Sequence, residues 1–267
     1  MILASTPPFT LVLSLLAALM YAIPAIWVRQ LSHATSRYCV ATAWLLHGTV
    51  ITMGLLGDPA YFGFAPALSV TAWLVAAAYA VESHIFPQLQ TRWALCGLGA
   101  AAVVAAGVFP GSPIPSSAPV WLPLHLAFGV ASYGLFGTAV VHAWFMSRAE
   151  NRIRLAEDPH TGLPLLTLER LTFRFVTAGF LLLSVTLLIG FSFGDTLYGR
   201  PNAWHRDHKM VFSVLAWLTF AGLLIGRRAF GWRGKRAIKV LYTGTAFLLL
   251  AYVGSRFVFE VVLGRSP

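Results

Sequence analysis

WLPLHLAFGVASYGLFGTAVVHAWFMS, residues 121–147, is apolar enough to lie in lipid and yet carries a histidine near its start. On a helix of 3.6 residues per turn, the small and polar side chains of this stretch share one face. They are His125, Gly129, Ser132, Tyr133 and Gly137. The other side is Leu, Phe, Val and Ala, so one face is suited to close helix packing and the rest to lipid or core. An ionisable group at the edge of a membrane helix indicates a functional site; the alternative is an interfacial histidine bonded to a neighbouring helix.

The composition predicts an integral membrane protein. The chain is 58% hydrophobic and 10% charged, against roughly 25% charged in soluble domains. The net charge of +10 does not indicate nucleic-acid binding, because the basic residues cluster in a few short loops. Cys39 and Cys96 lie far apart, and no C-x-x-C or C-x-x-C-H occurs, which argues against a thioredoxin-like oxidoreductase and against covalently attached c-type haem.

Apolar runs of about 20 residues, enough to span a bilayer, occur eight times. We therefore expect an all-α polytopic bundle in a single membrane domain, 1–267, without internal repeats. The first run lacks the marks of a cleaved signal peptide and is expected to be retained. The runs are 9–28, 38–56, 66–85, 92–109, 121–147, 170–193, 208–226 and 239–262.

The loops predict the orientation of these helices. Assigning loops to alternate sides places 14 Lys and Arg on one face and five on the other. The rich face is cytoplasmic by the positive-inside rule. Both termini are then outside, as expected for a multi-pass protein of a bacterial inner membrane.

Four of the eight histidines are interpreted without a functional role. Three of them, His33, His84 and His160, belong to short cytoplasmic connections, and His142 is interpreted as an interfacial side chain at the cytoplasmic end of its helix. The other four are His47, near mid-membrane, and His125, His205 and His208, on the outer side.

Two facing imidazoles are a common way to hold haem iron. The last outer loop also offers aromatic and cationic side chains, which suit a flat macrocycle with carboxylate tails. The alternative is an aromatic and basic belt at the membrane surface. These side chains are Tyr198, Arg200, Trp204, Arg206 and Lys209.

Several short motifs resemble a known family. LHL and SYGLF within 124–136 resemble the histidine-bearing helix of cytochrome c assembly proteins of CcsA/CcmC type. WHRDHK at 204–209, leading into VLAWL at 214–218, resembles the end of that family's tryptophan-rich outer motif and the helix after it. GWRGKR at 231–236 and YVGSR at 252–256 resemble the short, eight-helix YpjD/HemX-like branch, and this resemblance runs over residues 40–262.

The match to the outer motif is partial. Trp204, Asp207 and Lys209 agree with it, whereas His205 and Arg206 do not, and the motif's upstream tryptophans are missing. The larger members carry a second outer histidine after the motif. No histidine follows His208 here, so His208 would serve in that place.

The resemblance implies a protein that binds haem b at the outer face and assists cytochrome c assembly or haem delivery. His125 and His208 would be the axial ligands, with His205 as a competitor for the second position. Trp204 would line the pocket, and His47 would be a lower relay or entry ligand. The cations facing the propionates would be Arg200, Arg206 and Lys209.

The expected partners are haem, membrane lipid and other cytochrome c assembly proteins or an apocytochrome. No covalent catalytic group is needed, so we do not expect an enzyme. Two alternatives remain open: a transporter of haem or another small molecule, and a regulatory or scaffold protein that works through the Arg-rich loops at 148–174 and 226–239.

Overall fold

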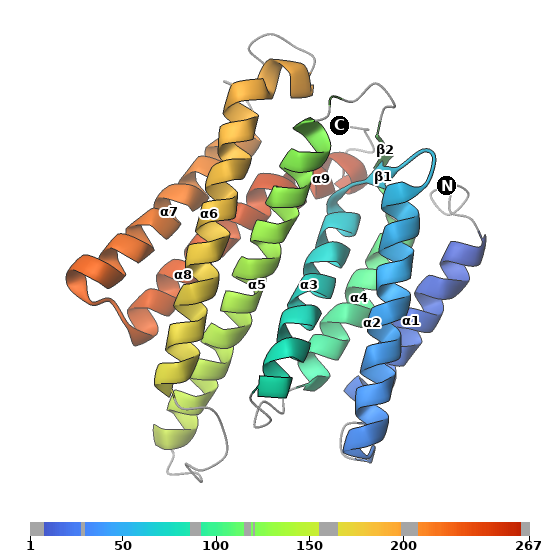
Figure 1. Ribbon diagram of the computed structural model, residues 1–267, viewed down its shortest axis with the longest axis horizontal. Helices are drawn as coiled ribbons and strands as arrows, with labels where there is room; N and C mark the ends of the chain where they lie inside the picture. Colours follow the sequence, from blue (N-terminus) through green and yellow to red (C-terminus); the bar gives the residue numbers. More distant parts are fainter. Residues whose placement is uncertain are drawn as a thin grey trace. The chain divides into compact units, whose positions relative to one another are not determined.

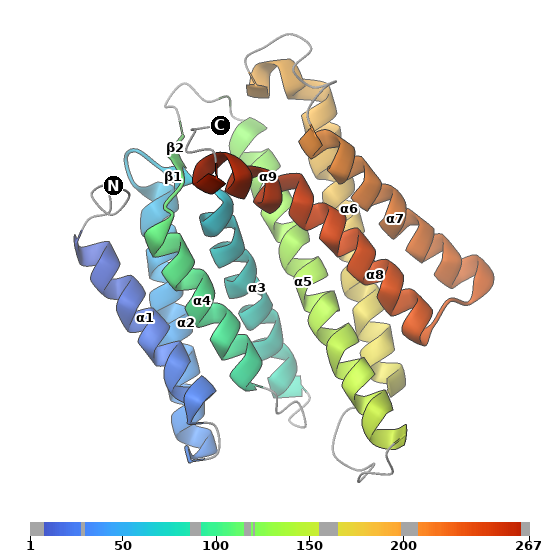
Figure 2. The same ribbon diagram turned by 180° about the vertical axis from the view of Figure 1, so that it is seen from behind.

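The computed structural model describes residues 8–27, 30–85, 92–114, 119, 121–154, 165–198 and 208–262. It confirms the all-α polytopic bundle (Figures 1 and 2). In these ranges seven helices are long and apolar enough to cross a membrane, and an eighth, α4, is shorter. The helices are α1 (Pro8–Ile26), α2 (His33–Leu56), α3 (Phe64–Ile85), α4 (Arg92–Val108), α5 (Trp121–Arg154), α6 (Leu165–Tyr198), α7 (His208–Phe230) and α8 (Gly234–Leu249).

Short elements complete the described chain. A two-stranded antiparallel ribbon pairs β1 (Tyr61–Phe62) with β2 (Ser112–Pro113). After α8 the chain continues through a π-helical segment, η3 (Leu250–Gly254), then α9 (Ser255–Phe257) and a second π-helical segment, η4 (Val258–Val262).

Several helices extend beyond the predicted apolar runs. Helix α5 continues to Arg154 and α6 begins at Leu165, because polar residues extend a helix once it has left the membrane. Helix α2 begins five residues earlier than its apolar run, and Ser32 caps it by accepting a hydrogen bond from the Thr35 backbone N–H at 3.1 Å.

Contacts between Cα atoms group the chain into two compact units. Unit 1 comprises residues 1–117 and 256–267, and unit 2 comprises residues 118–255. In unit 1, α1 packs against both α2 and α4 around a core that contains Tyr21, Ala43 and Val103.

Both ends of the described chain lie at one end of unit 1 (Figure 1). Phe257 of α9 lies edge-on against Phe64 at the start of α3, with ring centroids 5.5 Å apart. At the same end, Ser14 near the start of α1 lies against Gly107 near the end of α4. The position of both chain ends at one end of unit 1 agrees with an even number of membrane crossings. Which side faces the cytoplasm stays a prediction from the charges.

Unit 2 is built on the antiparallel pair α5 and α6, which run side by side along their length (Figures 1 and 2). Phe136 of α5 stacks on Phe220 of α7, with centroids 3.8 Å apart, so these two fully buried rings join the pair to the α7–α8 hairpin. Near its C-terminal end α6 bends at Phe193, whose backbone is not helical (φ −123°, ψ 15°).

Candidate functional site

His125 lies in the second turn of α5 and faces α6. Its Nδ1 is 3.1 Å from the backbone carbonyl oxygen of Thr186. Because a carbonyl oxygen only accepts, Nδ1 must carry the proton, and in the neutral ring Nε2 then carries the lone pair. This is the arrangement in which a histidine ring is oriented for metal binding by a partner on its other nitrogen.

The packing face predicted for this helix is confirmed. A Cβ at Gly190 of α6 would lie 3.3 Å from Cε1 of His125, so the glycine allows the ring to approach α6 closely. On the same face, Gly129 lies against Thr186. The Tyr133 hydroxyl donates to the carbonyl of Leu248, which joins this face to α8 as well.

An aromatic pair lies one turn before His125. The indole of Trp121 stacks on the ring of Phe193 at the bend of α6, with centroids 4.2 Å apart and planes at 12°. Trp121 is 41% exposed, so the pair lies at the end of the α5–α6 interface with part of the Trp121 side chain accessible. The sequence analysis did not include these two residues in the site.

His208 is the first residue of α7 and is exposed. Trp217, nine residues later, donates from Nε1 to Ser184 Oγ of α6 at 2.8 Å. Helices α6 and α7 run in opposite directions, so nine residues back from Trp217 on α7 match nine residues forward from Ser184 on α6. Nine residues are about 13 Å of helix, and this places His208 roughly level with Phe193. By this reckoning His125, which contacts α6 at Thr186 and Gly190, lies about one turn from His208 in depth. That the two rings meet at one depth in a shared cavity stays a prediction.

Lys209 follows His208 in the first turn of α7 and is half-buried. The remaining predicted site residues, Arg200, Trp204, His205 and Arg206, lie outside the described residues. The preference for His208 over His205 as second ligand therefore stays a prediction.

His47 belongs to unit 1, where it is fully buried. Its Nε2 lies 2.8 Å from Ser69 Oγ of α3, and its Nδ1 lies 3.5 Å from the Tyr21 hydroxyl of α1. The prediction that His47 faces the bundle interior is thus confirmed. Both ring nitrogens have partners, so the residue links three helices, and its role as a relay or entry ligand stays a prediction.

The interfacial interpretation of His142 was wrong. The side chain is 1% exposed, and its ring lies edge-on against Phe175 of α6 at 5.3 Å. The error came from the helix end, because α5 runs twelve residues beyond His142, to Arg154, instead of ending near residue 147.

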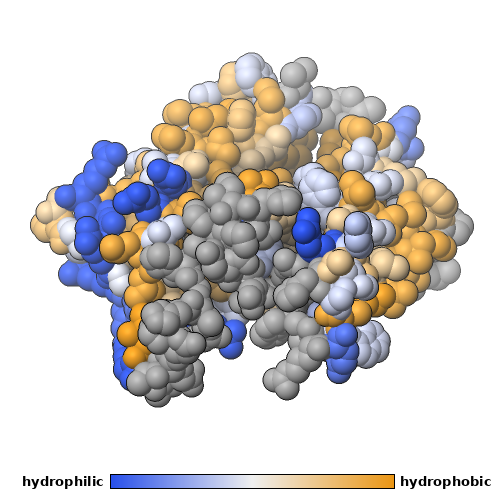
Figure 3. Space-filling view, turned by 60° about the horizontal axis from the view of Figure 1, so that its bottom comes forward, coloured by the Kyte–Doolittle hydropathy of each residue, from blue (hydrophilic) through white to orange (hydrophobic). Residues whose placement is uncertain are grey.

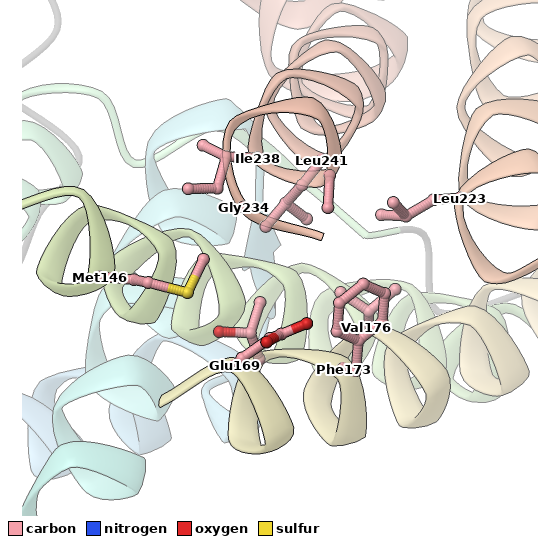
Figure 4. A pocket seen from close by; sticks show the side chains of 10 residues that line it. Met146, Glu169, Phe173, Val176, Leu223, Gly234, Ile238 and Leu241 are labelled. Atoms are coloured by element: carbon pink, nitrogen blue, oxygen red, sulfur yellow. The ribbon is translucent and has the colours of Figure 1, made fainter. Parts of the chain in front are cut away.

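One charged cluster in unit 2 was not predicted as a cluster. Glu169 of α6 is 7% exposed and forms an ion pair with Arg227 at the end of α7. Arg233, before α8, lies 3.7 Å from the same carboxylate oxygen. Glu169 also lines a small, mainly apolar pocket together with Met146 and Ile238 (Figure 4). The two arginines are 58 and 64 positions from Glu169 in the chain, so spacing alone could not bring them to this carboxylate.

Known proteins with similar sequences include inner membrane protein YpjD of Escherichia coli K12, which is 31% identical over 143 residues, 52% of each chain. The alignment thus spans about half the length of that relative. An uncharacterized 28.8 kDa protein of Azospirillum brasilense is 29% identical over 250 residues, 91% of this chain and 83% of the relative.

A cytochrome c biogenesis protein CcsA of Prochlorococcus marinus is 33% identical over 90 residues, 34% of this chain and 28% of the relative. No solved structure matches the chain. The protein-family model described as cytochrome c assembly protein matches residues 10–263, which is nearly the whole length of the chain. The chain therefore belongs to the cytochrome c assembly protein family.

Proposed function

We propose that this protein binds haem b at the outer end of unit 2 and thereby assists cytochrome c assembly in a bacterial inner membrane. The observation that carries the proposal is the hydrogen bond from His125 Nδ1 to the Thr186 carbonyl. It holds the ring in one tautomer and one orientation, with Nε2 as the free ligand atom. Membership in the cytochrome c assembly protein family supports the choice of haem.

The residues present fit a haem held by two imidazoles. His125 supplies a rigidly oriented ring, because α5 and the α6 backbone both fix it. His208 is the first residue of α7 and lies within about one helical turn of His125 in depth. It is exposed, so its ring is accessible to a ligand. Trp121, one turn before His125 on α5, offers a flat apolar surface at the same end of that helix.

The basic side chains of the same end suit the carboxylate tails of the ligand. Lys209 follows His208, and Arg200 and Arg206 precede it in the chain. Charge-assisted hydrogen bonds from such side chains to carboxylates are strong and orient the bound group. We propose that these cations fix the rotation of the macrocycle and that Trp204 completes the wall of its pocket.

The test is the absorption spectrum of the full chain purified in mild detergent. We expect a Soret band with low-spin features in the unmodified protein. His125→Ala and His208→Ala should each convert low-spin to high-spin features or reduce the haem retained. Added imidazole should restore the low-spin spectrum of His125→Ala, because it replaces the missing ligand atom.

His160→Ala is the matched control, since it removes a histidine from the predicted cytoplasmic connection. It should leave the spectrum unchanged. A colourless unmodified protein would favour the scaffold alternative. A spectrum unaffected by the double substitution of His125 and His208 would show that other residues hold the iron.

A further inference from the structure

The connection between α7 and α8 is held in one conformation. The backbone N–H of Trp232 donates to the carbonyl of Gly226 at 3.0 Å. Gly231 and Gly234 both adopt left-handed conformations, with φ of +62° and +54°, which favour glycine. The connection is thus a defined turn. We use the name α7–α8 turn for residues 227–239, which include the last turn of α7 and the start of α8.

One buried carboxylate anchors this turn to α6. Glu169 pairs with Arg227, whose guanidinium also lies 4.5 Å above the ring of Phe173. Arg233 approaches the same carboxylate from the other side of the turn. The negative charge of Glu169 is therefore engaged by two guanidinium groups, and the turn presents the rest of its positive charge to its surroundings.

Four further cations of the turn are exposed. The guanidinium of Arg236 is fixed 4.1 Å above the ring of Trp232. Among the residues that the structure describes, Arg228, Lys235 and Lys239 form no ion pair. Figure 3 shows hydrophilic side chains gathered over the region where α7 and α8 meet. The four exposed cations are Arg228, Lys235, Arg236 and Lys239.

Each of the two helices continues from this positive charge into an exposed apolar stripe. On α8, Lys235 and Lys239 are followed on the same face by Tyr242, which is 39% exposed, and Leu249, which is 40% exposed. On α7, Ile225, three residues before Arg228, is 60% exposed. On these two neighbouring helices, exposed cations and exposed apolar side chains therefore lie within one or two helical turns of each other.

We propose that the α7–α8 turn is a binding site for an anionic phospholipid of the membrane leaflet on this side. Arg228, Lys235 and Lys239 bind the headgroup phosphate, and the acyl chains lie along the apolar stripes. The apolar stripes favour a phospholipid over a soluble anion, because a soluble anion has no hydrocarbon chains to pack on the apolar surface beside the cations. The fixed turn keeps the cations together, which distinguishes this site from a general excess of positive charge.

Native mass spectrometry of the full chain tests the proposal. The protein in mild detergent is mixed with equal amounts of dioleoylphosphatidylglycerol and dioleoylphosphatidylcholine, and the retained lipids are counted. Each basic side chain near an anionic surface contributes about fivefold to binding. We therefore expect the anionic lipid to be retained about tenfold or more over the zwitterionic one.

The variant R228Q/K235Q/K239Q should lose this preference while keeping its thermal unfolding temperature, because the three side chains are exposed and the contacts of Glu169 and Trp232 remain. K235Q/K239Q provides a milder version with a partial loss. The control R154Q/R170Q/R174Q removes the same charge from exposed positions on α5 and α6 and should keep the preference. Equal retention of the two lipids by the unmodified protein, or an equal loss in the control, would overturn the proposal.

Discussion

His125 Nδ1 and the Thr186 carbonyl oxygen lie 3.1 Å apart, although 61 residues separate them in the chain. The carbonyl belongs to the membrane-spanning part of α6, so a backbone atom orients the imidazole. A backbone partner cannot be removed by a side-chain substitution. The orientation of His125 is therefore best tested by substituting a residue that packs against its ring.

Gly190→Ala should disturb the orientation of His125. The added methyl group would lie 3.3 Å from Cε1, which is tighter than ordinary contact, so the ring must shift by a few tenths of an ångström. We expect weaker haem retention or a shifted Soret band in the absorption spectrum. Gly129→Ala is the control, because its methyl group would lie 3.6 Å from Thr186 Cγ2, an ordinary contact. Identical spectra for both variants would contradict this role of Gly190.

His47→Ala should destabilise unit 1 and leave a haem spectrum unchanged. The substitution removes the buried partner of Ser69 and of Tyr21, and an unsatisfied buried polar group costs about 1–3 kcal/mol. Thermal unfolding in detergent measures the loss. Thr49→Ala, on the exposed side of α2, should have little effect. Loss of haem from a stably folded His47→Ala protein would instead support the entry-ligand role.

Glu169→Gln should destabilise unit 2 by about 1.5–3 kcal/mol, because it removes the charge that Arg227 and Arg233 share. The unfolding temperature again provides the measurement. Replacing both partners, Glu169→Met with Arg227→Met, should cost less than Glu169→Gln alone, since no buried charge is left without a partner. A larger cost for the double variant would show that the ion pair is not the main contribution of these residues.

The membrane orientation can be tested with reporter fusions. Fusions at Arg152 and Arg233 should report a cytoplasmic location, and a fusion after Gly264 an external one, because the loops rich in Lys and Arg stay inside. A cytoplasmic report from the fusion after Gly264 would mean that the helix count or the orientation is wrong.

Hydropathy predicted the helices well because a bilayer requires long apolar runs, and each of the eight runs became a helix. It predicted their ends poorly. Residues such as Arg148 and Glu150 extend α5 through backbone hydrogen bonding, which hydropathy does not measure. The burial of His142 was missed for the same reason.

The candidate site was predicted only in part. The face of α5 that carries His125 follows from helical periodicity, and its contact with α6 confirmed it. Its backbone partner and the stack of Trp121 on Phe193 could not be predicted, because they depend on how α5 and α6 pair and on the bend at Phe193. The link from Glu169 to the α7–α8 turn likewise depends on tertiary packing.

Unit 1 also contains two indoles that stack in parallel, those of Trp44 on α2 and Trp73 on α3. Their centroids are 4.6 Å apart with planes at 8°, and each Nε1 donates to the backbone carbonyl of the other residue, at 3.2 and 3.0 Å. Two parallel indoles this close couple their electronic transitions, and the coupling appears in ultraviolet circular dichroism. The α2–α3 contact therefore contributes an optical signal that is separate in wavelength from a haem Soret band, so that one sample can report on both the packing of unit 1 and the haem binding proposed for unit 2.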